Sequence, residues 1–124
     1  DGHILRQSKS LELVDARILP NSSPIPCRLL QARTAKGVSQ KELGIRLGIE
    51  PGSASSRMTH YEKGRHSPDY QMLKRIGKEL DVPVAYFFCE SDVLADLICR
   101  IDKLSKKRQL ELLKQLNASQ SHIE

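Results

Sequence analysis

Short helical segments, each closed by a glycine or a proline, constrain the fold of this chain more than any other feature of its sequence. From residue 25 onward, apolar residues recur three or four positions apart, which is the spacing of one face of an α-helix. Stop signals follow at Gly37, Gly48, Gly64 and Pro83, so each segment has only a few turns. Because such short helices are unstable alone in water, they must pack against one another. The sequence therefore predicts an all-α fold.

Start and stop signals order the predicted helices along the chain. The clearest start is a capping box, in which the Ser39 side chain accepts a hydrogen bond from a backbone N–H and Glu42 reaches back toward Ser39. We expect helices over residues 26–35, 39–47, from Ser53 or Ser55 to Gly64, 69–80 and 84–88, followed by two that begin near Ser91 and Ser105.

The predicted helices group into one domain with a further element at either end. Residues 25–90 form a five-helix domain, and we expect the three aromatic side chains at 86–88 to close its core. Residues 91–124 supply two C-terminal helices with stripes of leucine and isoleucine, which either fold back on the domain or pack against a second copy as a dimerisation element. Residues 1–24 end in a stretch rich in proline and serine, and we interpret them as an extended N-terminal arm and linker.

The positive charge of the chain is concentrated in one segment. The formal net charge is +5, and residues 25–66 hold eight lysine and arginine side chains against three glutamates. A local excess of positive charge attracts polyanions, nucleic acids among them. The basic residues of this segment are Arg28, Arg33, Lys36, Lys41, Arg46, Arg57, Lys63 and Arg65.

Composition narrows the class of protein further. The apolar runs fall short of the roughly 20 residues that a membrane-spanning helix needs, so we expect no membrane partner. The cysteines at 27, 89 and 99 form no CxxC pair and fit free thiols in a reducing compartment. We therefore expect a cytoplasmic protein with no metal and no cofactor, and a bacterial or phage-encoded origin is compatible with this composition.

The polar stretch at residues 48–64 is the clearest functional signal. It follows the short helix at 39–47 after a tight connection, and Met58 and Tyr61 anchor its own helix on one side. The other side of that helix shows small or polar residues. Two such helices in succession are typical of a helix-turn-helix, whose second helix packs through one face and presents the other to the major groove of DNA.

Several motifs agree with one protein family in their order and spacing. They are Arg33-x-x-x-Gly37-Val38-Ser39-Gln40-x-x-Leu43-x-x-x-Leu47-Gly48-Ile49, then Tyr61-Glu62-Lys63-Gly64-x-x-x-Pro68, then Leu73-x-x-Ile76-x-x-x-Leu80-x-Val82-Pro83. Over residues 25–90 or so, the chain resembles the lambda-repressor-like, XRE/Cro-type helix-turn-helix proteins. The resemblance implies a five-helix domain that binds double-stranded DNA, and the symmetry of operators favours a homodimer.

The resemblance also implies roles for individual residues. Gln40 would bind the DNA backbone and help to orient a base-reading side chain, and Arg33 would form a partly buried structural ion pair with Glu62. The outward positions 55, 56 and 60 would contact bases, while cations around them would contact phosphates. The candidate DNA-binding residues are Gln40, Lys41, Ser53, Ser55, Ser56, Arg57, Thr59, His60, Lys63 and Arg65.

One feature departs from the family pattern. Gly48 and Gly64 are 16 positions apart, which is farther than the family usually allows. The extra residues at 50–53 either lengthen the turn or add a turn to the second helix. An added turn would carry the start of that helix about 5 Å further, and Ser53 would then join the candidate base contacts.

These observations predict a sequence-specific DNA-binding transcriptional regulator. Most simply, it is a repressor that reads an operator through a helix at about 53–63. The alternative is an antitoxin-like module that binds DNA and also uses its C-terminal helices to hold a partner protein. An enzyme is not expected, because no oriented His–Asp pair or oxyanion loop accompanies Ser55 and Ser56. We therefore assign no catalytic residues and no metal ligands.

Overall fold

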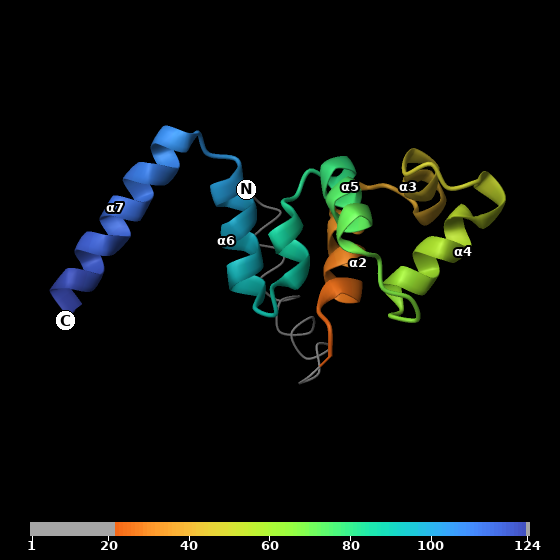
Figure 1. Cartoon of the computed structure of the whole chain (residues 1–124), viewed down its shortest axis with the longest axis horizontal. Helices are drawn as coiled ribbons and strands as arrows, with labels where there is room; N and C mark the ends of the chain where they lie inside the picture. Colours follow the sequence, from red (N-terminus) through yellow and green to blue (C-terminus); the bar gives the residue numbers. More distant parts are fainter. Residues whose placement is uncertain (1–21, 124) are drawn as a thin grey trace.

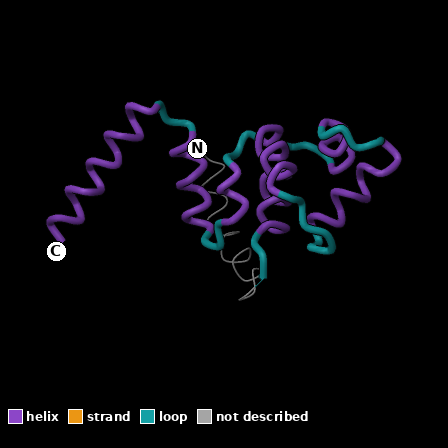
Figure 2. Tube along the Cα trace, viewed as in Figure 1, coloured by secondary structure: helices purple, strands orange, loops and turns teal. Residues whose placement is uncertain are grey.

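The structure is a computed structural model that describes residues 22–123, so most of the predicted arm at 1–24 lies outside the described residues. Within that range the chain forms six α-helices, one short 3-10 helix and no strand (Figures 1 and 2), which confirms the predicted all-α class. The elements are α2 (Ile25–Lys36), α3 (Gln40–Arg46), α4 (Pro51–Glu62), α5 (Tyr70–Leu80), η1 (Val84–Phe88), α6 (Asp92–Asp102) and α7 (Lys106–Ile123).

Side chains of the predicted start signals cap four of the helices. Ser39 Oγ accepts from the backbone N–H of Glu42 at 3.0 Å, as in the first half of a capping box. The carboxylate of Glu42 does not reach back, however, because it pairs with Arg46 one turn later at 2.6 Å. The second half of the predicted capping box is therefore wrong. Equivalent caps are made by Asp69, Ser91 and Ser105.

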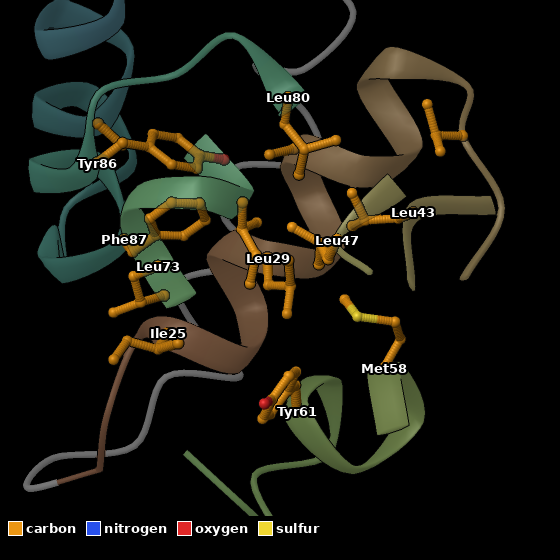
Figure 3. Close-up of a cluster of buried hydrophobic side chains, with 14 of the residues drawn as sticks. Ile25, Leu29, Leu43, Leu47, Met58, Tyr61, Leu73, Leu80, Tyr86 and Phe87 are labelled. Carbon is orange, nitrogen blue, oxygen red and sulfur yellow. The ribbon is translucent and has the colours of Figure 1, made fainter. Parts of the chain in front are cut away.

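The core lies where α2, α3, α4, α5 and η1 meet (Figure 3). Its largest fully buried apolar side chains come from all five of these elements, so the short helices stabilise one another as the sequence requires. They are Leu29, Leu43, Met58, Leu73, Ile76 and Phe87. Tyr86 is also buried, but the Phe88 side chain is 55% exposed. The prediction that three rings close the core is therefore wrong for Phe88, because successive residues of a short helix cannot all face inward.

Close contact between two backbones fixes the angle between α3 and α4. A Cβ atom placed on Gly44 would lie 2.6 Å from the Cβ atom of Ala54, so no larger residue fits at this crossing. The chain then reverses at Gly48, whose φ of 88° lies in the left-handed region that glycine adopts readily. Small residues at the crossing and at the turn therefore hold the two helices together.

The two C-terminal helices behave differently from each other. α6 folds back on the domain, where Asp92 and Ala95 are buried and Ile98 and Cys99 pack against the core. α7 extends away from α6 at the end of the molecule opposite α3 and α4 (Figure 1). No helix in the described part of the chain is long and apolar enough to cross a membrane. The predicted domain boundary at residue 90 stays a prediction.

Candidate nucleic-acid interface

The second helix of the motif, α4, begins earlier than we predicted. It starts at Pro51, not at Ser53 or Ser55, and it ends at Glu62. Proline suits the first position of a helix because its missing N–H would have no partner there and its φ is already helical. The extra residues at 50–53 therefore extend the helix, and the turn from α3 stays short.

α4 separates its residues cleanly between two faces. Ala54, Met58 and Tyr61 are buried against the other helices. On the opposite side, positions 52, 56, 59 and 63 recur at the spacing of a single helical stripe. This stripe consists of Gly52, Ser56, Thr59 and Lys63, of which only Thr59 is partly buried. Ser53 and Ser55 are also exposed, so the whole outer surface is polar and its first turns carry only small side chains.

A chain of hydrogen bonds joins α2, α3 and α4 behind this surface. Arg33 Nε lies 2.5 Å from Glu62 Oε2, and Arg33 Nη2 donates to Glu62 Oε1 at 3.1 Å. Gln40 Nε2 donates to the same Oε1 atom at 2.9 Å. The amide oxygen of Gln40 in turn accepts from the Thr59 hydroxyl at 2.9 Å. The ion pair is therefore connected, through Gln40, to a side chain on the outer face of α4.

Arg57 lies on the other flank of α4. Two positions along a helix point in nearly opposite directions, so the structure does not bring Arg57 and Thr59 together. The Arg57 guanidinium lies 6.0 Å from the centre of the Tyr61 ring, and its Nε donates to the Tyr61 hydroxyl at 3.4 Å. Arg57 thus borders a shallow hollow that it shares with Glu50 and Arg75.

Comparisons with known proteins agree with this geometry. A family model described as helix-turn-helix matches residues 29–87, which span α3, the turn and α4. The chain belongs to the lambda-repressor-like helix-turn-helix family. Among solved structures, the crystal structure of the transcriptional regulator BswR is similar to it, with 38% sequence identity and a TM-score of 0.71. The match covers 76% of this chain and 93% of that one. No curated protein matches the chain.

In this helix-turn-helix domain, ion pairs neutralise part of the positive charge of residues 25–66. Three of its cations are neutralised, since Arg28, Arg33 and Arg46 each pair with a carboxylate. The remaining cations have no carboxylate within ion-pair distance among the described residues, and all of them are exposed. They are Lys36, Lys41, Arg57, Lys63 and Arg65. All the candidate phosphate-binding cations therefore belong to the unpaired group.

His60 of the helix-turn-helix domain is less accessible than a base-reading side chain on an open helix face would be. It is partly buried, and its ring stacks on His66 with 5.0 Å between the ring centres. Its Nδ1 atom is buried and has no hydrogen-bond partner within the described residues. Across residues 22–123, no three His, Cys, Asp or Glu side chains are grouped so that they could hold a metal ion.

Two contacts of the helix-turn-helix domain escaped the sequence analysis. Arg75 of α5 donates to the backbone oxygen of Leu47 and so caps the C-terminal end of α3. The Thr59 hydroxyl donates to the Gln40 side chain and so links two of the candidate DNA-binding residues. Neither contact has a local signal, because the partners are 28 and 19 positions apart. Thr59 itself was already among the candidate DNA-binding residues, so only its link to Gln40 depends on the tertiary structure.

Proposed function

We propose that this chain is a transcriptional repressor that binds its operator as a homodimer and inserts α4 into the major groove. The observation that carries the proposal is the outer face of α4, which is polar and lined by small side chains while the opposite face is buried. A helix with this distribution can approach base edges closely without exposing apolar surface. The major groove is about 12 Å wide, enough for one such helix.

The bonding pattern behind α4 supports distinct roles for the residues of the interface. Ser56 and Thr59 of the outer stripe are the central base contacts, with Ser53, Ser55 and His60 beside them. Gln40 holds Thr59 and faces the DNA backbone at the start of α3. Four of the five unpaired cations bind phosphates, since a cation already neutralised by a carboxylate would gain little from one. They are Lys41, Arg57, Lys63 and Arg65.

The proposed role in regulation has independent support from a relative. BswR is described as a transcriptional regulator, and it is similar to this chain over most of both lengths. Repression is the simplest form of such regulation, because a protein seated in the major groove at a promoter excludes other proteins from it.

The C-terminal helices support the proposed homodimer. α6, α7 and the connection between them expose seven large apolar side chains, although α6 already buries another face in the domain. An amphipathic helix such as α7 is marginal in water unless its apolar stripe is covered. The exposed residues are Val93, Leu94, Leu97, Leu104, Leu110, Leu113 and Leu116. We name this set the leucine face, and we infer that a second copy covers it.

The leucine face also supports a second candidate function. An antitoxin-like protein would use it to hold a different chain while the helix-turn-helix domain binds DNA. Sedimentation of the purified chain separates the two, because a homodimer forms without any other protein. A monomer that becomes a heterodimer with a co-purified chain would support the antitoxin-like function.

Selection of bound sequences from a random DNA pool tests the proposed function most directly. We expect a palindromic consensus, because a two-fold symmetric dimer reads two half-sites. Affinity for that consensus should then be titrated with salt for Arg57→Ala, His60→Ala and, as a matched control on α7, Arg108→Ala. Arg57→Ala should lower the slope of log K against log salt by about one, and His60→Ala should alter base preference. If the α7 control weakens binding as much as the α4 variants do, the assignment of α4 is wrong.

A further inference from the structure

A cavity of about 600 Å³ opens between α2 and α6, away from the proposed DNA interface. The end of α5 and the short helix η1 contribute to its walls, while no residue of α3 or α4 does. Its volume falls within the range of sites that bind small molecules, about 300 to 1,000 Å³. The proposed function does not use this cavity.

Small apolar side chains create the cavity. Ala32 and Ala35 of α2 and Ala95 and Cys99 of α6 all line it, so the two helices have little side-chain volume on these sides. Burial raises the pKa of the Cys99 thiol to about 11, so the thiol is neutral at physiological pH and adds no charge to the wall. Leu80, Val82 and Leu104 complete the apolar lining. The interior therefore suits an apolar body.

Most polar groups at the inner end of the cavity already form hydrogen bonds within the protein. Arg28 is completely buried, and its guanidinium donates to the backbone oxygens of Cys89 and Glu90 at 2.7 and 3.1 Å, as well as to Asp92. Arg28 and the Tyr86 hydroxyl both donate to the amide oxygen of Gln31, at 2.7 and 3.2 Å. Four of the five N–H donors of Arg28 are therefore used within the protein, and its charge is paired with Asp92, so it is a poor charged partner for a ligand.

The mouth of the cavity is positively charged. Lys103 donates to the Asp81 carboxylate at 2.8 Å, and Arg100 lies 3.4 Å from Asp96. Lys36 also lies on the rim, and it has no carboxylate within ion-pair distance in the described part of the chain. Three cations therefore face two carboxylates, which leaves one positive charge for an anion.

The same charge argues against the most obvious macromolecular occupant, which is α7 of a second copy. α7 carries four cations and one carboxylate, so it would bring positive charge to a positive rim. The charged residues of α7 are Lys106, Lys107, Arg108, Lys114 and Glu111. Of the leucine face only Leu104 lines the cavity, whereas Leu94 and Leu97 of α6 do not.

We propose that the cavity between α2 and α6 binds a small organic anion with an apolar body, its acidic group held at Lys36, the one rim cation without a carboxylate partner among the described residues. Such a ligand would touch α2, which also carries Arg33 of the interface, and α6, which carries part of the leucine face. The site stands on its own geometry and does not require that the proposed function be correct.

Two fluorescent probes of similar size and different charge test the proposal on the full chain. Anilinonaphthalene sulfonate is anionic, and N-phenyl-1-naphthylamine is its neutral counterpart. We expect both to bind with one saturable site per chain. Lys36→Glu should lower the affinity for the anionic probe on the order of tenfold, because it reverses the charge at the rim. It should change the affinity for the neutral probe by less than about twofold. Ala35→Trp, which fills the cavity from an exposed position, should abolish the binding of both.

Leu113→Ser on α7 is the matched control, because these probes also bind exposed apolar surface. Both probes should still bind this variant, because Leu113 does not line the cavity. Binding that is lost with Leu113→Ser, or that survives Ala35→Trp in a protein whose circular dichroism is unchanged, would overturn the proposal. If Ala35→Trp does not fold, Lys36→Glu decides, because Lys36 is exposed and its replacement leaves the core intact. Equal weakening of the two probes by Lys36→Glu would also overturn it.

Discussion

Two arginines on the same helix form ion pairs of very different character. Arg28, near the start of α2, pairs with Asp92 of α6, and the two side chains are 0% and 1% exposed. Arg33, in the last turn of α2, pairs with Glu62 of α4, and these side chains are 13% and 6% exposed. The first pair attaches α6 to the domain. The second attaches the helix of the proposed DNA interface.

The difference between the two pairs lies in what their remaining hydrogen bonds reach. Arg28 also donates to the backbone oxygens of Cys89 and Glu90, so these hydrogen bonds stay within the interior of the protein. Glu62 accepts a further bond from Gln40, which leads on to the surface of α4. The Arg28–Asp92 pair therefore holds α6 to the domain, whereas the Arg33–Glu62 pair is also linked to a surface side chain and positions it.

The largest effect should follow from breaking the Arg28–Asp92 pair. Arg28→Met leaves the Asp92 carboxylate buried without its cation, so we expect the free energy of unfolding to fall by about 3–5 kcal/mol. Urea denaturation measures this change. Arg46→Met, which breaks an exposed pair with Glu42, is the control and should cost less than about 1 kcal/mol.

A double variant sharpens this first test. Replacing both members of a buried ion pair with apolar residues is often neutral, because no uncompensated charge remains. Arg28→Met combined with Asp92→Leu should therefore recover most of the lost stability. A single Arg28→Met variant as stable as the Arg46→Met control would show that the pair does not hold α6 to the domain.

The second effect concerns the pair that leads to the surface. Arg33→Met should lower the free energy of unfolding by about 1–3 kcal/mol, since charge-assisted hydrogen bonds to Glu62 are lost. Unlike Arg28→Met, it should also weaken operator binding by about tenfold, because Glu62 and Gln40 lose their fixed positions. Fluorescence anisotropy with labelled DNA measures the affinity. Unchanged affinity in a folded Arg33→Met protein would break the proposed link between this pair and the interface.

The two glutamines that extend these pairs allow a matched comparison. Gln31 accepts from Arg28 at 2.7 Å, and Gln40 donates to Glu62 at 2.9 Å. Gln31→Ala should cost about 1 kcal/mol of stability and change operator affinity by less than about twofold. Gln40→Ala should weaken operator binding by about tenfold, with little loss of stability. Parallel denaturation and anisotropy experiments on both variants check the contrast, and equal effects on affinity would contradict it.

The smallest effect belongs to an exposed pair. The hydrogen bond and charge of Lys103 hold the pKa of Asp81 below its ordinary value, although both side chains are more than half exposed. A carboxyl group whose pKa is lowered by folding adds stability above its unfolded pKa and loses it as the pH falls through the folded value. Lys103→Met should therefore raise the pKa of Asp81 in an NMR titration and cost at most about 0.5 kcal/mol at neutral pH. Its effect should vanish in strong acid, and an effect that persists there would assign Lys103 another role.

The sequence predicted the helices well because their signals are local. Ser39, Asp69, Ser91 and Ser105 each cap a helix through a backbone N–H three positions away. The start of α4 was missed because a Pro-Gly pair signals both a turn and the first turn of a helix. The sequence alone does not decide between the two, whereas in the structure α4 begins at Pro51 and Ala54, in its first turn, packs against Gly44.

The candidate site was predictable where the family pattern carries it and not where it depends on distant contacts. The positions of Gln40 and Glu62 followed from motif spacing, and the structure links the two side chains directly. Arg28, by contrast, was counted with the surface charge, although it is completely buried. Its partner Asp92 lies 64 positions away, in a helix that the sequence left free to fold back or to pair with a second copy.

The sequence by itself determined that this chain is a string of short, capped helices with a polar second helix in a helix-turn-helix. Those properties depend on spacings of three or four residues, which are fixed as soon as the chain is helical. Only the tertiary structure decided which cations remain unpaired, which side chains border the cavity, and which leucines are left exposed. Each of these depends on how helices far apart in sequence pack, because burial and pairing are properties of the folded core and not of any one segment.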